Sequence, residues 1–130
     1  MEKYNQLTPE IIAQIQAVSE HVLVGDDINV DFARDEMPIY GTHMPELVVQ
    51  PTSTEEVAAV MKICYENTIP VTPRGAGTGL AGGAVPLLGG VLIDTSKMNR
   101  ILNYDLENFV VEIESGVLLN DLANDCLSKG

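Results

Sequence analysis

The sequence predicts a mixed fold of the α+β class, with an α/β arrangement in its first part. Short β-branched runs at 47–51, 69–73 and 89–95 surround one helical pattern at 53–69, in the order strand, helix, strand, glycine-rich loop, strand. Strands in that order usually lie parallel in one sheet. The chain has 130 residues, of which 45% are hydrophobic, so it is long enough to bury a core.

An amphipathic helix is expected near the N-terminus. Thr8 is a favoured helix cap and Pro9 a favoured first helical residue. The apolar residues that follow at helical spacing are Ile11, Ile12, Ile15 and Val18. This stripe predicts one buried face.

Residues 24–44 read as an acidic, irregular segment. Its carboxylates are Asp26, Asp27, Asp31, Asp35 and Glu36. They could form a metal-binding cluster or a solvated surface loop. Their spacing matches no EF-hand loop, and carboxylates are common in turns, so the pattern favours a surface loop.

The central helix follows the buried strand "ELVVQP", which ends at Pro51. Ser53 and Glu56 have the spacing of a capping box. The apolar face expected on this helix comprises Val57, Val60, Met61 and Cys64. A cysteine on such a face is more often a small core residue than a reactive thiol.

The remaining elements are short. "IPVTP", "GGVLIDT" and "NFVVEIE" predict strands, and "LLNDLANDCLSK" predicts a helix that reaches Gly130. Nothing in the chain follows to cover the far face of this helix. We therefore expect the chain to be the N-terminal part of a larger domain.

Composition excludes several classes of partner. Seven basic against nineteen acidic residues leave a net charge of −12, which disfavours nucleic acid and anionic lipid. Residues 75–93 carry no charge but are too rich in glycine for a membrane span. The N-terminus lacks the pattern of an export signal, and two cysteines suit a reducing compartment, so we expect a cytoplasmic protein.

Residues 71–90 hold seven of the eleven glycines. The run 77–82 fits G-x-G-x-x-G, but only eight residues separate Gly82 from Val91, too few for the helix of a Rossmann unit. No Lys-Ser or Lys-Thr follows for a P-loop, and the acidic chain does not suit a KH domain. A packed tight turn remains possible, but Arg74 and Thr78 beside so many glycines favour an anion or cofactor site.

The longer pattern around this loop resembles a known family. P-R-G-x-G-T-G-L-x-G-G runs without a gap over 73–83, and "MNRI" follows at 98–101. Residues 47–117 resemble the flavin-binding domain of FAD-linked oxidases of the p-cresol methylhydroxylase and vanillyl-alcohol oxidase type. Within that family they are similar to the branch that holds the FAD-binding subunit of glycolate oxidase and the D-lactate dehydrogenases. The resemblance implies two subdomains with FAD between them, with 1–102 the first and 103–130 the start of the second.

The resemblance also implies a set of cofactor-binding residues. Those expected to line the FAD pyrophosphate and ribose are Arg74, Gly75, Ala76, Gly77, Thr78, Gly79, Leu80, Gly82 and Gly83. A further flavin contact is expected from Ser115, Gly116 and Val117. Members that attach FAD covalently often carry histidine where Thr78 stands here, so non-covalent FAD is expected. No catalytic residue and no metal ligand is expected within this chain.

The resemblance finally implies a reaction for the whole protein: an FAD-dependent D-2-hydroxyacid dehydrogenase or oxidase, of the glycolate or D-lactate type. Hydride would pass from the substrate Cα to flavin N5, and the electron acceptor would be an electron-transferring flavoprotein, an iron–sulfur subunit or a quinone. These residues alone are expected to be inactive and to bind FAD weakly. The alternatives are a flavoenzyme like UDP-N-acetylmuramate dehydrogenase and a non-catalytic nucleotide-binding module.

Overall fold

A four-stranded sheet forms the centre of the first part of the chain. The computed structural model describes residues 3–130. The strand order is β1 (Val22–Val24), β2 (Leu47–Val49), β4 (Val91–Asp94), β3 (Val71–Arg74). β2, β4 and β3 are parallel and β1 is antiparallel to β2. The predicted α/β character of this part is confirmed.

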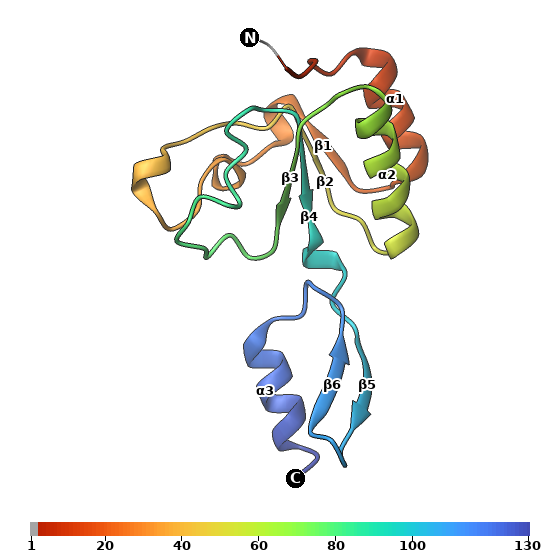
Figure 1. The fold of residues 1–130 in the computed structure, drawn as a ribbon, viewed down its shortest axis with the longest axis vertical. Helices are drawn as coiled ribbons and strands as arrows, with labels where there is room; N and C mark the ends of the chain where they lie inside the picture. Colours follow the sequence, from red (N-terminus) through yellow and green to blue (C-terminus); the bar gives the residue numbers. More distant parts are fainter. Residues whose placement is uncertain (1–2) are drawn as a thin grey trace.

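Two helices cover one face of this sheet (Figure 1). α1 spans Pro9–Val18 and α2 spans Thr54–Glu66. The core between helices and sheet includes Ile11, Ile15, Leu47, Val49, Val60, Cys64, Ile69, Val91 and Ile93. Cys64 is a core residue as expected, and its burial raises the pKa of the thiol to about 11. Met61 was wrongly placed on the buried face: it is 44% exposed, and Ile63 packs against the core instead.

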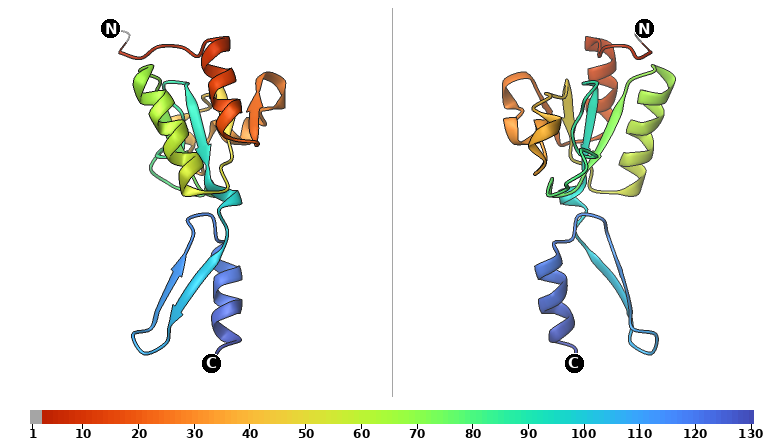
Figure 2. Two further views of the ribbon diagram at one scale, coloured as in Figure 1. Left: turned by 90° about the vertical axis from the view of Figure 1, so that its right-hand side faces the viewer. Right: turned by 60° about the vertical axis from the view of Figure 1, so that its left-hand side comes forward.

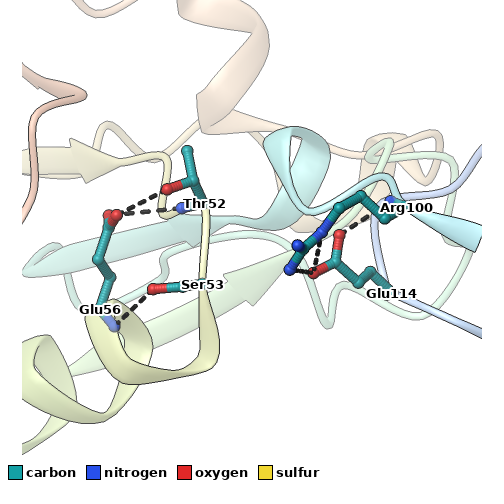
Figure 3. Close-up of polar contacts among 5 residues, drawn as sticks. All are labelled: Thr52, Ser53, Glu56, Arg100 and Glu114. Carbon is teal, nitrogen blue, oxygen red and sulfur yellow. Dashed lines mark hydrogen bonds and ion pairs between the residues drawn. The ribbon is translucent and has the colours of Figure 1, made fainter. Parts of the chain in front are cut away.

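The N-terminus of α2 is capped differently from a simple capping box. The hydroxyl of Ser53 accepts from the N–H of Glu56 at 3.2 Å, as predicted. The Glu56 carboxylate accepts from the hydroxyl of Thr52 at 2.7 Å (Figure 3). It also accepts from the hydroxyl of Ser19 at 2.8 Å, and so ties α2 to the end of α1. Burial alone would raise the pKa of Glu56, but these bonds together hold it below its usual value.

Irregular segments 25–46 and 75–90 cover the other face of the sheet (Figures 1 and 2). The first contains only short 3₁₀ turns, at Gly25–Asp27, Val30–Ala33 and Pro38–Tyr40. The core residues on this face are Ile28, Val48 and Leu92, with Leu23 and Phe32 packed against them. The sheet is therefore sandwiched between a helical layer and a loop layer.

The rest of the chain forms a second unit. A hairpin of β5 (Ile101–Asp105) and β6 (Val110–Ile113) precedes α3 (Leu119–Leu127). Where this unit begins, Arg100 donates to the Glu114 carboxylate at 2.7 Å, which lowers the pKa of Glu114 (Figure 3). The predicted division of the chain after residue 102 stays a prediction.

Two strands were not predicted. β1 has only three residues, which is too short for a periodic pattern, and it exists through its pairing with β2. β5 reads I-L-N-Y-D, in which half-buried residues are three positions apart rather than two. The alternation that identifies a strand is missing there.

Candidate functional site

The glycine-rich loop connects two parallel strands without a helix. It leaves β3 after Arg74 and reaches β4 through Gly90, crossing the face of the sheet that the helices leave open (Figure 1). Its residues form bends, turns and irregular backbone, with no helix or strand. The exclusion of a Rossmann unit is therefore confirmed, because the loop contains no helix whose N-terminus could bind a pyrophosphate.

The first half of this loop offers a run of free hydrogen-bond donors. Within residues 3–130, none of the seven backbone N–H groups from Gly75 to Ala81 donates to any acceptor. The second half is largely closed: Gly82 donates to the Asp35 carboxylate at 2.8 Å, and Gly90 to the Glu46 carboxylate at 3.0 Å. Consecutive unpaired N–H groups form the type of concavity that binds anions.

The glycines of this loop are of two kinds. Gly77 and Gly82 have φ of +74° and +73°, and a Cβ at Gly82 would lie 2.7 Å from the Tyr40 ring. The fold therefore requires glycine at these two positions, because other residues rarely adopt this backbone conformation. Among the described residues 3–130, a Cβ on Gly75 or Gly83 would meet nothing within 4 Å, and one on Gly79 only the Asp35 carboxylate at 3.9 Å.

The open glycines have no left-handed backbone either, so nothing within residues 3–130 requires glycine at these three positions. Close approach of a bound molecule to the backbone is the remaining physical reason for glycine. Because these three residues lack a Cβ, they leave an open cradle beside the free N–H groups, which side chains at these positions would fill. The loop thus fits a phosphate-bearing cofactor.

Arg74 is fixed at the start of the loop. Its guanidinium donates to the carbonyl of Arg34 at 2.7 Å and of Asp31 at 2.8 Å, and it lies 5.8 Å from the Phe32 ring centroid. Two of its five N–H donors are used, so others remain for a ligand. The adjoining hollow of about 500 Å³ is also lined by Asp31, Asp35 and Glu36, and by Arg34, which pairs with Asp31 at 2.8 Å. Three carboxylates against two guanidinium groups make the hollow itself a poor place for phosphate.

The structure brings the second predicted segment close to Arg74. Gly116 donates to the Met98 carbonyl at 2.8 Å, and a Cβ on Gly116 would overlap the carbonyl oxygen of Thr95. The Thr95 hydroxyl donates in turn to the Arg74 carbonyl at 3.4 Å. Arg74 and Gly116 therefore lie on either side of Thr95, at the carboxyl end of the parallel strands, where sheets of this kind usually bind ligands.

The neighbours of Gly116 are more varied in exposure. Ser115 is exposed, whereas Val117 is half-buried. Gly116 and Val117 border a hollow of about 190 Å³ with Ser96, Asn99 and Asp121. The role of this segment toward a flavin stays a prediction.

Sequence reasoning missed three residues of the site: Thr95, Asp35 and Tyr40. Asp35 carried a weak signal, because its carboxylate also accepts from the N–H of Met37, two residues on, at 2.8 Å. Such local bonds are typical of aspartate in turns. The contacts of Thr95 and Tyr40 join distant segments and leave no local trace.

Among the helices of residues 3–130, none is long and apolar enough to cross a membrane.

Comparisons with known proteins place the chain in a family. A model described as "FAD binding domain" matches residues 45–130. D-lactate dehydrogenase of Anaerostipes hadrus is 61% identical over 129 residues, covering 98% of this chain and 27% of the relative. Glycolate oxidase subunit GlcD of Bacillus subtilis (strain 168) is 37% identical over 108 residues, covering 81% and 23%.

A solved structure of p-cresol methylhydroxylase with substrate bound superimposes with a TM-score of 0.80 at 30% identity. The match covers 92% of this chain and 24% of that one. The chain thus spans about a quarter of the length of the relatives that it matches. These relatives include FAD-dependent oxidoreductases, and the fold is the predicted one. The chain belongs to the FAD-binding domain family of the FAD-linked oxidases, of the p-cresol methylhydroxylase type.

Proposed function

We propose that this chain binds the pyrophosphate of FAD through the backbone N–H groups of Gly75–Ala81. The observation that carries the proposal is the run of seven unpaired donors beside the open glycines. In a chain of net charge −12, few side chains can attract phosphate. Backbone dipoles and the single guanidinium of Arg74 supply that attraction.

Each predicted residue then has a part. Gly75, Gly79 and Gly83 let the cofactor approach the backbone, and Gly77 and Gly82 shape the turns between them. Thr78 adds an exposed hydroxyl. The turn containing Ser115, Gly116 and Val117 contacts the cofactor further along, which we infer from its position beside Thr95.

The reaction that we propose for the whole protein is oxidation of a D-2-hydroxyacid, of the D-lactate or glycolate type. The support is the 61% identity to a D-lactate dehydrogenase and the 37% identity to a component of glycolate oxidase. Bound FAD would supply the hydride acceptor. Substrate contacts, the base and the electron acceptor would depend on sequence beyond these residues, so this chain contributes binding and orientation of the cofactor.

Alanine at the open glycines should weaken FAD binding without weakening the fold. In the product of the complete gene, we expect Gly75→Ala and Gly79→Ala each to raise the FAD dissociation constant about tenfold or more, since a methyl group blocks the cradle. Titration of apoprotein into FAD, followed by flavin fluorescence, measures this. Leu88→Ala, at an exposed position in the second half of the loop, is the control. Unchanged affinity in both glycine variants would show that the pyrophosphate binds elsewhere.

We also propose that the flavin is held non-covalently, because Thr78 offers no ring nitrogen for attachment. Acid denaturation of the holoprotein should leave the yellow colour in the supernatant. The absorbance of the washed pellet near the flavin bands measures any flavin that stays behind. Flavin in the pellet at a stoichiometric level would contradict the proposal.

A further inference from the structure

Residues 31–40 form a support beneath the glycine-rich loop, and we propose that Asp35 is the positioning residue within it. Asp35 would hold the loop at Gly82 so that the N–H groups of 75–81 stay free for the cofactor. This inference rests on the proposed function and names the residue that prepares the site. It touches the loop and not the cofactor.

The geometry of Asp35 is that of a fixed clamp. One carboxylate oxygen accepts from the N–H of Met37 in its own segment at 2.8 Å. The other accepts from the N–H of Gly82 across 47 positions of sequence, also at 2.8 Å. Hydrogen bonds to an ionised acceptor are stronger than neutral ones. The bond to Met37 therefore fixes the carboxylate, and the bond to Gly82 holds the loop in place relative to residues 35–37.

Two neighbours restrain the same part of the loop. The N–H of Glu36 donates to the carbonyl of Gly79 at 3.2 Å. The Tyr40 ring packs where a side chain on residue 82 would lie, and Gly82 has a left-handed backbone. Three contacts from 35–40 thus set the turn at 79–82 before any ligand arrives. Ordering a loop in advance lowers the entropic cost of binding.

The charge of Asp35 makes a passive role costly. A carboxylate beside an anion site repels phosphate, and this repulsion weakens FAD binding. If Asp35 favours FAD binding on balance, its effect on the position of the loop must outweigh the repulsion. The competing hypothesis is that Asp35 occupies the N–H of Gly82 in place of phosphate. Positioning and competition predict opposite signs: removal of the carboxylate weakens FAD binding in the first case and tightens it in the second.

The test compares FAD affinity with the stability of the apoprotein, in the product of the complete gene. Asp35→Asn keeps the size of the side chain but leaves only one acceptor oxygen for two N–H groups. We expect its FAD dissociation constant to rise about tenfold, with the melting temperature of the apoprotein little changed. Asp27→Asn makes the same change at an exposed position of segment 25–46 and should bind FAD as the parent does.

A double-mutant cycle with a glycine that does not contact Asp35 adds a second readout, because direct contact between the two substituted side chains cannot then cause coupling. Asp35→Asn and Gly75→Ala act on the same run of donors, so their effects on the dissociation constant should be non-additive, whereas Asp27→Asn and Gly75→Ala should add. If Asp35→Asn does not fold, Asp35→Glu, which displaces the carboxylate by one methylene, takes its place with the same expectation.

FAD affinity that is unchanged or tighter in the Asp35 variant overturns the inference, as does strict additivity with Gly75→Ala. Failure of the proposed function looks different, because Gly75→Ala and Gly79→Ala alone would then leave FAD affinity unchanged. Weakened binding in the glycine variants with normal binding in the Asp35 variant would reject the positioning role alone.

Discussion

Gly90→Ala should be among the most destabilising single-methyl changes in this chain, costing about 3 kcal/mol or more of unfolding free energy. Gly90 has a φ of +69°, which costs an L-residue about 1–2 kcal/mol. A Cβ would also lie 2.6 Å from Pro70 Cγ and overlap the Pro70 carbonyl oxygen. That overlap is with backbone, which cannot rotate away, and overpacking of this kind adds about 1–3 kcal/mol.

The site of that clash explains why the loss is global. The Gly90 carbonyl accepts from the N–H groups of Glu46 at 2.8 Å and Leu47 at 3.2 Å, where β2 begins. The Pro70 carbonyl accepts from Val91 at 2.9 Å, where β4 begins. Any shift of residue 90 therefore disturbs three parallel strands at once. Urea unfolding followed by circular dichroism measures the change.

Gly83→Ala is the matched control for stability. It lies in the same loop and has no left-handed backbone, and a Cβ there meets no atom of the described part of the chain within 4 Å. We expect a change within about 0.5 kcal/mol, as for other exposed positions. Equal losses in the two variants would mean that the two kinds of glycine do not differ as the structure indicates.

This distinction among the glycines could not be predicted from the sequence. Their concentration in 71–90 predicted an unusual loop, and the pattern 73–83 pointed to FAD, but both treat every glycine alike. Which glycine is needed by the fold depends on its distant neighbours. Tyr40 against Gly82, and Pro70 against Gly90, are contacts between segments that only the folded chain brings together.

Asp35 illustrates the same limit for the site. It is one of five carboxylates between Asp26 and Glu36. The turn signal that Asp35 carries is common for aspartate and does not single it out among them. The helix at 9–18 was predictable because its apolar residues recur at helical spacing. The strands at 47–49 and 91–94 were predictable because each is a short, continuously buried run bounded by turn residues. Asp35 acts through one tertiary hydrogen bond, which has no period.

Gly116→Ala should loosen the junction between the first and second units. It should also weaken FAD binding at least tenfold, although residue 116 lies 33 positions beyond Gly83. Its backbone is not left-handed, so the whole cost is steric. The added Cβ would overlap the Thr95 carbonyl oxygen and lie 2.8 Å from the Met98 carbonyl oxygen. These neighbouring atoms belong to the backbone, so they cannot move aside as the end of a flexible side chain could.

The first unit should survive this change, because the core around Ile15, Val49 and Val91 does not include residue 116. We therefore expect the amide protons of Met98 and Gly116 to exchange faster while those of the four-stranded sheet stay protected. Hydrogen exchange with and without FAD measures both effects. Glu112→Ala, an exposed change on β6, is the control. Normal FAD affinity with a loosened junction would show that cofactor binding needs only the glycine-rich loop, and that the turn at 115–117 serves the fold alone.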